Sequence, residues 1–289
     1  MRIDAHHHLW DLDAVSYPWL MEKGAPRFFG DPTPIQRNYL LPEFSADARQ
    51  HGMRGSVHIQ VGAADPLAEA RWVDAVAAAN PDWPMVQVAA CDLTDDALLD
   101  RLAALSALPS LRGVRQIIGR APGEDAKTGT NDLLTNPAFA KGLAQLGARG
   151  LSFDLQLLPE LMEATADILK DTPQTPVVLC HAGSPHDRTP DGLKAWARAL
   201  RLLSDLPHVS CKLSGLGMFD HDWTAAKIAP IVSEVLAQFG AQRVMFGSNF
   251  PVDSLSSDYS TLIAAYEALV PATDHAAVFG GTAQRFYRF

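Results

Sequence analysis

Eight short apolar segments, nearly all followed by amphipathic ones, run along the 289 residues, and this alternation predicts a (β/α)8 barrel. The apolar segments are rich in β-branched residues, which is typical of parallel strands buried on both faces. The stretches between them have the helical spacing expected of helices that cover such a sheet. An open doubly wound sheet is the alternative, but no G-x-G-x-x-G turn follows an early strand. We therefore expect one barrel domain over residues 1–289.

The predicted elements alternate regularly after an irregular beginning. The first strand ends in His6 and His8, and seven more are predicted over residues 55–61, 84–91, 111–118, 151–156, 176–181, 208–214 and 243–249. Helices are predicted over residues 66–79, about 95–105, 136–146, 159–170, 191–203, 223–239, 259–269 and 273 to about 285. Residues 9–41 fit neither pattern, and a loop of this length in a compact domain is usually functional. We interpret it as a wall over the site, with Tyr17 and Trp19 as candidate lining, or as a loop that these aromatics pin to the barrel.

Charge and composition limit the classes of partner. The 24 Lys and Arg against 33 Asp and Glu give a net charge of −9, which argues against a nucleic-acid surface. A small anionic substrate stays compatible, because a few arginines can dominate one pocket. No apolar run approaches the length of a membrane span, and the N-terminus does not resemble a signal peptide. The three cysteines, Cys91, Cys180 and Cys211, lie in apolar runs without metal-type spacing, which is typical of buried thiols in a reducing compartment. We expect a cytoplasmic enzyme.

The histidine triplet at residues 6–8 is the strongest local signal. His6 and His8 are two residues apart, so in a strand they project from the same face, and His7 projects from the other. Two converging neutral imidazoles can bind a divalent metal or polarise a carbonyl group. An affinity tag is the alternative. It is disfavoured because only three histidines occur and Asp4 and Ala5 precede them inside an apolar strand pattern.

Polar side chains mark the ends of most other strands, where barrel enzymes carry their active sites. These residues are His58, Gln60, Arg115, Gln116, Asp154, Gln156, His181, Lys212, Ser214, Ser248 and Asn249, with Asp253 shortly after. Arg115 is expected to bind a substrate carboxylate in bidentate fashion. His58 is in mid-strand and is expected to be a packing residue. Lys212 either binds an anion or pairs with Asp154 inside the barrel, and both alternatives stay open.

Six motifs together resemble one family. They are residues 3–10 (IDAHHHLW), 17–20 (YPWL), 112–115 (RGVR), 181–183 (HAG), 211–215 (CKLSG) and 245–252 (MFGSNFPV). This set resembles the amidohydrolase-2 branch of the amidohydrolase superfamily, in the group of sugar-acid lactonases. That group includes L-fuconolactone and L-rhamnonolactone hydrolases and 2-pyrone-4,6-dicarboxylate lactonase. The resemblance spans almost the whole chain and is more specific for the family than for the substrate.

The resemblance implies site residues and also shows two departures. His6 and His8 would be the His-x-His pair of the first strand, and His181 the histidine of the sixth. The fifth strand lacks the histidine that the superfamily usually places there. Asn249 stands where the family has the aspartate that activates water, and an amide is not a general base at neutral pH. Asp253 could supply the missing carboxylate if the loop curls back.

From these residues we expect a hydrolase that opens the lactone ring of a small sugar acid or dicarboxylate. The three imidazoles would polarise the carbonyl, directly or through one divalent metal such as Zn²⁺, since zinc can be held by three histidines and water. Water would be aligned by Asn249 and deprotonated by Asp253 or by a histidine. The residues expected to bind substrate are Arg115, Lys212, Gln60, Gln156 and Trp19.

The sequence leaves the reaction type, the metal dependence and the oligomeric state open. Without a strand-eight base the pocket could instead isomerise a lactone or decarboxylate an acid, or the barrel could be a non-catalytic sugar-acid binder. The sequence decides neither metal dependence nor whether the chain forms a homo-oligomer.

Overall fold

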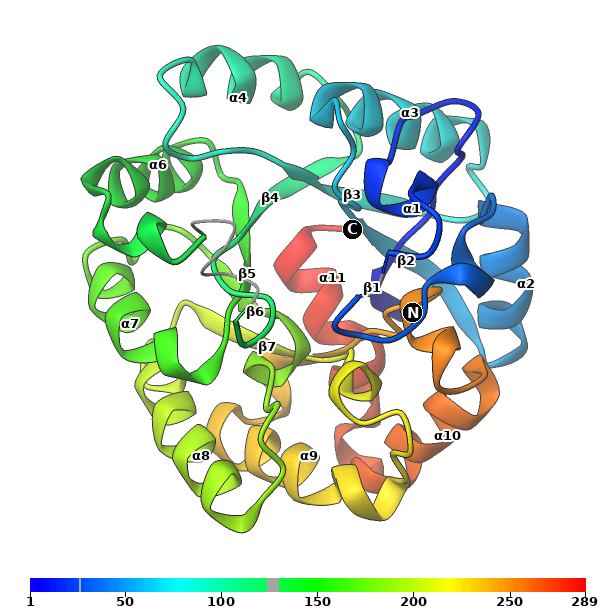
Figure 1. Ribbon diagram of the computed structural model, residues 1–289, viewed down its shortest axis with the longest axis vertical. Coiled ribbons are helices and arrows are strands. Elements are labelled where there is room, and N and C mark those ends of the chain that lie inside the picture. Colours follow the sequence, from blue (N-terminus) through cyan, green and yellow to red (C-terminus); the bar gives the residue numbers. More distant parts are fainter. Residues whose placement is uncertain (26, 124–129) are drawn as a thin grey trace.

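The computed structural model describes residues 1–25, 27–123 and 130–289, and within them eight strands form the predicted barrel (Figure 1). Each strand pairs in parallel with the next along the chain, from β1 to β8. The strands are β1 (Arg2–His7), β2 (Met53–Ile59), β3 (Met85–Ala90), β4 (Leu111–Ile117), β5 (Ser152–Gln156), β6 (Val177–Leu179), β7 (Val209–Leu213) and β8 (Val244–Phe246). The (β/α)8 prediction is therefore confirmed.

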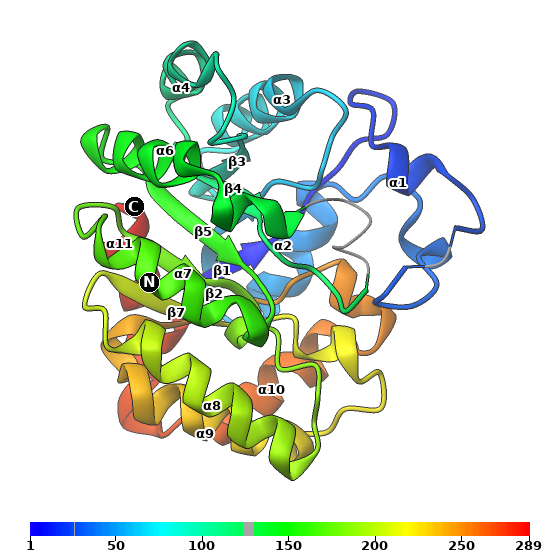
Figure 2. The same ribbon diagram turned by 60° about the vertical axis from the view of Figure 1, so that its left-hand side comes forward.

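Helices surround the strands and bury one apolar face against them. They are α2 (Leu41–Gln50), α3 (Pro66–Ala79), α4 (Leu98–Ser106), α6 (Pro137–Ala148), α7 (Met162–Lys170), α8 (Pro190–Ser204), α9 (Ala225–Phe239) and α10 (Tyr259–Leu269), with the short α1 (Pro18–Met21) and α11 (Thr282–Tyr287). Figure 2 shows α1 and its flanking loops projecting at the end toward which the strand arrows point. None of the helices in the described ranges is long and apolar enough to cross a bilayer.

Two helical segments differ from the sequence prediction. Helix α2 lies in a stretch that was not predicted as helix, although Pro42 and Glu43 stand in its first turn and Arg49 in its last. The predicted helix over 273–285 is interrupted by a π-turn over Ala277–Gly281, so α11 begins only at Thr282. Gly280 explains the interruption: a Cβ there would lie 2.0 Å from the Met1 carbonyl oxygen, so the turn packs directly against the N-terminus.

The barrel closes where β1 meets the segment after β8. The amide of Asn249 donates to the His6 carbonyl at 2.7 Å, and the amide of His8 donates to the Phe250 carbonyl at 2.7 Å. The buried Asp4 carboxylate accepts the amides of Ser248 at 2.9 Å and His6 at 3.1 Å, and the Tyr259 hydroxyl at 3.0 Å. Burial raises the pKa of Asp4 to about 6, and these donors act against that rise. This seam fixes the first and last strands in one register.

Gly247 allows the two sides of the seam to approach closely. A Cβ at this position would lie 2.4 Å from the His6 Cβ and 2.9 Å from the His6 amide nitrogen. No real Cβ tolerates such a contact, so a larger residue would push β8 away from β1.

A buried ion pair lies inside the barrel. The Lys212 ammonium is 2.6 Å from an Asp154 carboxylate oxygen, and both side chains are fully buried. The Tyr287 hydroxyl, from α11, lies 2.9 Å from both Asp154 oxygens and donates to that carboxylate. Of the two alternatives for Lys212, the structure shows the pairing with Asp154.

We expect Gly247→Ala to lower the free energy of unfolding by about 3 kcal/mol, because the added methyl group overpacks the seam against His6. Urea denaturation measures this change. Gly150→Ala is the control, since Gly150 has φ of 66° and open space around its Cβ position. It should lose only about 1 kcal/mol through left-handed strain. If both variants lost the same free energy of unfolding, crowding against His6 would not explain the destabilisation of Gly247→Ala.

Candidate active site

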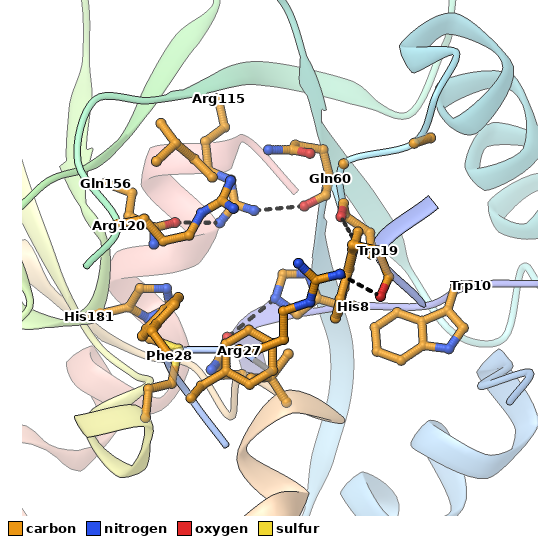
Figure 3. Close-up of a pocket in the computed structure, with 18 of the residues that line it drawn as sticks. His8, Trp10, Trp19, Arg27, Phe28, Gln60, Arg115, Arg120, Gln156 and His181 are labelled. Atoms are coloured by element: carbon orange, nitrogen blue, oxygen red, sulfur yellow. Dashed lines mark hydrogen bonds between the residues drawn. The ribbon is translucent and has the colours of Figure 1, made fainter. Parts of the chain in front are cut away.

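A cavity of about 380 Å³ opens at the carboxyl ends of the strands (Figure 3). Most of its polar lining comes from residues that end strands or follow them directly. The residues around it are His8, Trp10, Pro18, Trp19, Arg27, Phe28, Phe29, Gln60, Val61, Gly62, Ala63, Ala64, Arg115, Ile117, Arg120, Gln156, His181, Met218, Asn249 and Val252. Catalytic sites of barrel enzymes lie at this end.

Seven of the ten predicted site residues line the cavity, and three lie behind it. The seven are His8, His181, Asn249, Arg115, Gln60, Gln156 and Trp19. His6 is fully buried under His8 and His181, with ring centroids 5.1 and 4.6 Å from theirs. Asp253 lies behind Asn249, and Lys212 lies inside the barrel on Asp154.

His8 and Asn249 present two hydrogen-bond acceptors to each other. His8 Nδ1 is 2.8 Å from the Ile59 carbonyl oxygen, so Nδ1 carries the proton and Nε2 of the neutral ring is an acceptor. The Asn249 Nδ2 group donates to Asp253 Oδ1 at 2.8 Å, which turns the Asn249 Oδ1 atom toward His8 Nε2 at 3.2 Å. A hydrogen-bond donor from outside, such as water, is needed to satisfy both atoms.

His181 is held from below by the end of β7. Its Nδ1 atom is 3.0 Å from the Ser214 hydroxyl, which also accepts the His181 backbone amide at 3.3 Å. Gly215, the next residue, leaves room for the ring, because a Cβ there would lie 2.3 Å from His181 Nδ1. His181 is thus fixed through Nδ1, and its Nε2 atom is left for the cavity.

The backbone turns sharply at two of these side chains. His181 has φ of 55° and Asn249 has φ of 58°, in the left-handed region that non-glycine residues seldom adopt. Such strain is concentrated at functional sites, where the surrounding structure over-determines the conformation. For Asn249 the surrounding constraints are the seam hydrogen bond to His6 and the contact with Asp253.

Burial sets the charge states of the site. It lowers the pKa of His8 to about 3, and it lowers the pKa of His6 and of His181 well below 6.5, with further contributions from nearby cations. All three imidazoles are therefore neutral near pH 7. Burial raises the pKa of Asp253 to about 7, so this carboxyl group changes its protonation state near neutrality.

Arg115 is a buried cation held by neutral groups. Its guanidinium donates to the Gln60 carbonyl at 2.7 Å and to Gln156 Oε1 at 3.3 Å, while Nε has no partner. Arg120, which lies close enough to lower the pKa of Arg115, lines the same side of the cavity in Figure 3.

The long loop after β1 forms an aromatic wall that includes Trp19, whereas Tyr17, the other aromatic predicted to line the site, is fully buried and outside the lining. The Trp19 indole donates to the Val61 carbonyl at 2.7 Å, and the Arg27 guanidinium donates to the Trp19 carbonyl at 3.0 Å. Phe28 packs on Phe219 with centroids 5.4 Å apart. The loop is therefore both pinned to the barrel and part of the lining.

Sequence reasoning missed part of the lining. Arg120 follows the end of β4, the strand that carries Arg115, by three residues, and this position after a strand end is a signal that could have identified it. Arg27 comes from a loop, and Met218 and Val252 come from short 3-10 helices, and the positions of all three depend on tertiary contacts. His7 and His58 lie outside the cavity lining, as expected. His7 stacks on Phe44 at 3.9 Å, and His58 Nε2 donates to the Leu9 carbonyl.

The three histidines of the site are candidate ligands for a metal ion. Both ring nitrogens of His6 are buried and have no hydrogen-bond partner, so this ring could supply a metal ligand. His8 Nδ1 and His181 Nδ1 already face Ile59 and Ser214, so only the Nε2 atoms of these two rings could join His6 as ligands. In the described ranges no three His, Cys, Asp or Glu side chains are grouped so that they could hold a metal ion. The three imidazoles as arranged here do not fit a three-histidine metal centre.

Comparison with known proteins agrees with the fold and the motifs. A protein of Sinorhizobium fredii is 36% identical, with 99% of this chain and 98% of that protein covered. An L-fucono-1,5-lactonase of Burkholderia multivorans is 29% identical, with 99% and 96% covered. Crystal structures of an amidohydrolase from B. multivorans with bound HEPES and with bound Zn match with TM-scores of 0.84 and 0.83. Their identities are 28% and 26%, with 100% of this chain and 99% of theirs covered.

The amidohydrolase family profile matches residues 3–289, which include the strand-one histidines, the arginine of β4 and the whole seam between β1 and β8. With this match over nearly the full length, and a relative above 30% identity, the chain belongs to the amidohydrolase family.

Proposed function

We propose that this protein is a hydrolase that opens the lactone ring of a small sugar acid or dicarboxylate with water. The observation that carries the proposal is the pair of acceptors, His8 Nε2 and Asn249 Oδ1, 3.2 Å apart at the cavity wall. Two acceptors cannot hydrogen-bond to each other, and one water molecule beside both of them could donate a hydrogen to each. Family membership and the L-fucono-1,5-lactonase relatives support ester-ring hydrolysis as the reaction.

In the proposed mechanism, the water donates one hydrogen to Asn249 and the other to His8. Its oxygen attacks the ring carbonyl carbon, and His8 Nε2 takes the proton as general base. If the Ser214 hydroxyl donates to His181 Nδ1, the proton of the His181 ring is on Nε2 and can stabilise the developing oxyanion. The ring C–O bond then breaks, and His8 returns the proton to the departing oxygen, which gives a hydroxy acid.

Asp253 acts through Asn249 in this proposal, because it does not line the cavity. When Asp253 is ionised, the Asn249 amide donates to it and the Asn249 carbonyl oxygen faces His8. When Asp253 is protonated, it donates to that oxygen instead. The reversed amide then donates to His8 Nε2 and blocks the base. Arg115 and Gln156 would hold a carboxylate or hydroxyl group of the substrate.

Ring opening is tested by NMR on a panel of sugar-acid and carboxylate-bearing lactones. We expect hydroxy-acid products, and turnover that survives EDTA treatment. An isomer of unchanged mass, or release of carbon dioxide, would support the alternative reactions in the same pocket. Activity that EDTA abolishes and Zn²⁺ restores would contradict the role of His8 as base. It would instead indicate that His6, His8 and His181 rearrange around a divalent metal.

The pH profile tests the role of Asp253. Ionised Asp253 gives the active arrangement, so kcat/KM should fall as the pH drops through the Asp253 pKa of about 7. The Asp253→Asn amide can either donate to Asn249 or accept from it and does not titrate, so kcat/KM of this variant should show no inflection near pH 7. Asp258→Asn, at the exposed N-cap of α10, is the control that keeps the wild-type profile. An inflection retained in Asp253→Asn would show that another group titrates.

A further inference from the structure

A buried carboxyl group that the proposed mechanism does not use lies directly behind the cavity wall. Glu69 stands in the first turn of α3, is only 2% exposed and does not belong to the lining. Its Oε1 atom accepts the Val61 amide at 2.7 Å, and Val61 is part of the lining. Burying a carboxyl group is costly even when it is hydrogen-bonded, so its place behind this wall indicates a specific role.

Glu69 supplies an acceptor at the point where the pairing of β2 with β3 ends. The Gln60 amide still donates to the Val88 carbonyl of β3 at 2.9 Å. The next amide, that of Val61, donates to Glu69 instead. Residues 60–64 then line the cavity without belonging to a strand or a helix. The course of this segment therefore depends on Glu69.

The peptide group between Gln60 and Val61 is bound from both sides. Its carbonyl oxygen accepts the Arg115 guanidinium at 2.7 Å, and this bond is drawn in Figure 3. Its N–H group donates to Glu69. Hydrogen bonds at the two ends of one peptide group polarise and strengthen each other. Glu69 thus acts on Arg115 without touching it.

The backbone of Val61 also connects Glu69 to the aromatic wall. Val61 donates its amide to Glu69, and its carbonyl oxygen accepts the Trp19 indole N–H at 2.7 Å. Shortly after it, the Ala64 amide donates to the Ser16 carbonyl at 2.9 Å. One carboxyl group therefore lies behind two side chains of the lining, a guanidinium and an indole, that come from different strands and loops.

The contact between Glu69 and Val61 does not require a charged carboxylate. Burial raises the pKa of Glu69 to about 7, and the Val61 amide and the Arg115 guanidinium act against that rise, as does the Tyr17 hydroxyl. A protonated carboxyl group keeps an oxygen that accepts a hydrogen bond. The role of Glu69 thus depends on an acceptor atom at the correct reach, and it adds no inflection to the pH profile.

We propose that Glu69 is a positioning residue, which holds Arg115 and Trp19 in place at the cavity. It acts through the backbone of residues 60–61, does not touch the substrate and takes no part in proton transfer. Its effect on a substrate rests on the proposed lactone hydrolysis. Its effect on the two side chains is independent of the reaction.

The indole signal of Trp19 tests the positioning without turnover. In protein labelled with ¹⁵N-tryptophan, each of the six tryptophans contributes an indole N–H signal, and Trp19→Phe identifies that of Trp19. Glu69→Gln keeps an acceptor oxygen at the same reach, so this N–H should exchange with solvent within about two-fold of the wild-type rate. Glu69→Asp is shorter and should raise the rate at least roughly ten-fold, because the Val61 carbonyl is no longer held.

Asp74, on the same helix, provides the matched control. Its carboxylate accepts the Ser110 amide at 2.9 Å and so holds a loop at the other end of the barrel, before β4. Asp74→Leu should lower the stability of the protein and leave the Trp19 exchange rate unchanged. An unchanged rate in Glu69→Asp, or an equal rise in Asp74→Leu, would overturn the proposal. If Glu69→Asp does not fold, Glu69→Met, which fills a similar space without an oxygen or nitrogen acceptor, takes its place.

Kinetics on the lactone that the protein opens fastest test the effect on substrate. Glu69→Asp should raise KM at least roughly ten-fold and change kcat less than about three-fold, because it disturbs binding groups and leaves His8 and Asn249 in place. Glu69→Gln should restore KM to within about three-fold of wild type. Equal KM values in the two Glu69 variants, or a loss confined to kcat, would refute the role toward substrate. If no lactone is opened, the proposed function fails, and the Trp19 signal alone tests the positioning.

Discussion

The hydrogen bonds that join β1 to the segment after β8 position the side chains of the candidate active site. Asp4 accepts amides from both sides of the seam, and the amides of Asn249 and His8 complete it. Because Gly247 has no side chain, the segment directly after β8 can approach His6 closely. Residues 6–8 and 249 are separated by almost the whole chain, yet the closure of the barrel makes them neighbours. Site geometry and fold stability therefore depend on the same contacts.

Burial then determines what these neighbours can do. At the carboxyl end of the barrel it keeps His6, His8 and His181 neutral, and it leaves Asp253 with a pKa of about 7. Asn249 connects the two kinds of group, since its amide contacts a carboxylate on one side and an imidazole on the other. A carboxylate placed behind an amide can thus influence a base that it does not touch. This offers a physical reason why a chain with asparagine at position 249 can retain hydrolytic chemistry.

Much of the fold was predictable from the sequence because it depends on local periodicity. The strand predictions came within four residues of the observed bounds, and His6, His8, Arg115 and His181 were singled out because polar residues end apolar strands. The interruption before α11 was not predictable, because it arises from a contact between Gly280 and Met1. Likewise, the sequence left Lys212 between two roles, and only its distance to Asp154 decided the pairing. The position of Asp253 behind Asn249 depends on a left-handed turn that no sequence motif specified.

Hydrolysis in ¹⁸O-labelled water tests the central claim, ring opening by attack of water on the lactone carbonyl, most directly. The protein is incubated with the lactone that it opens fastest, and the product is analysed by mass spectrometry. The account predicts one labelled oxygen in the new carboxylate and none in the released hydroxyl group, because the acyl–oxygen bond breaks. Label in the hydroxyl group, or a product without label, would contradict it.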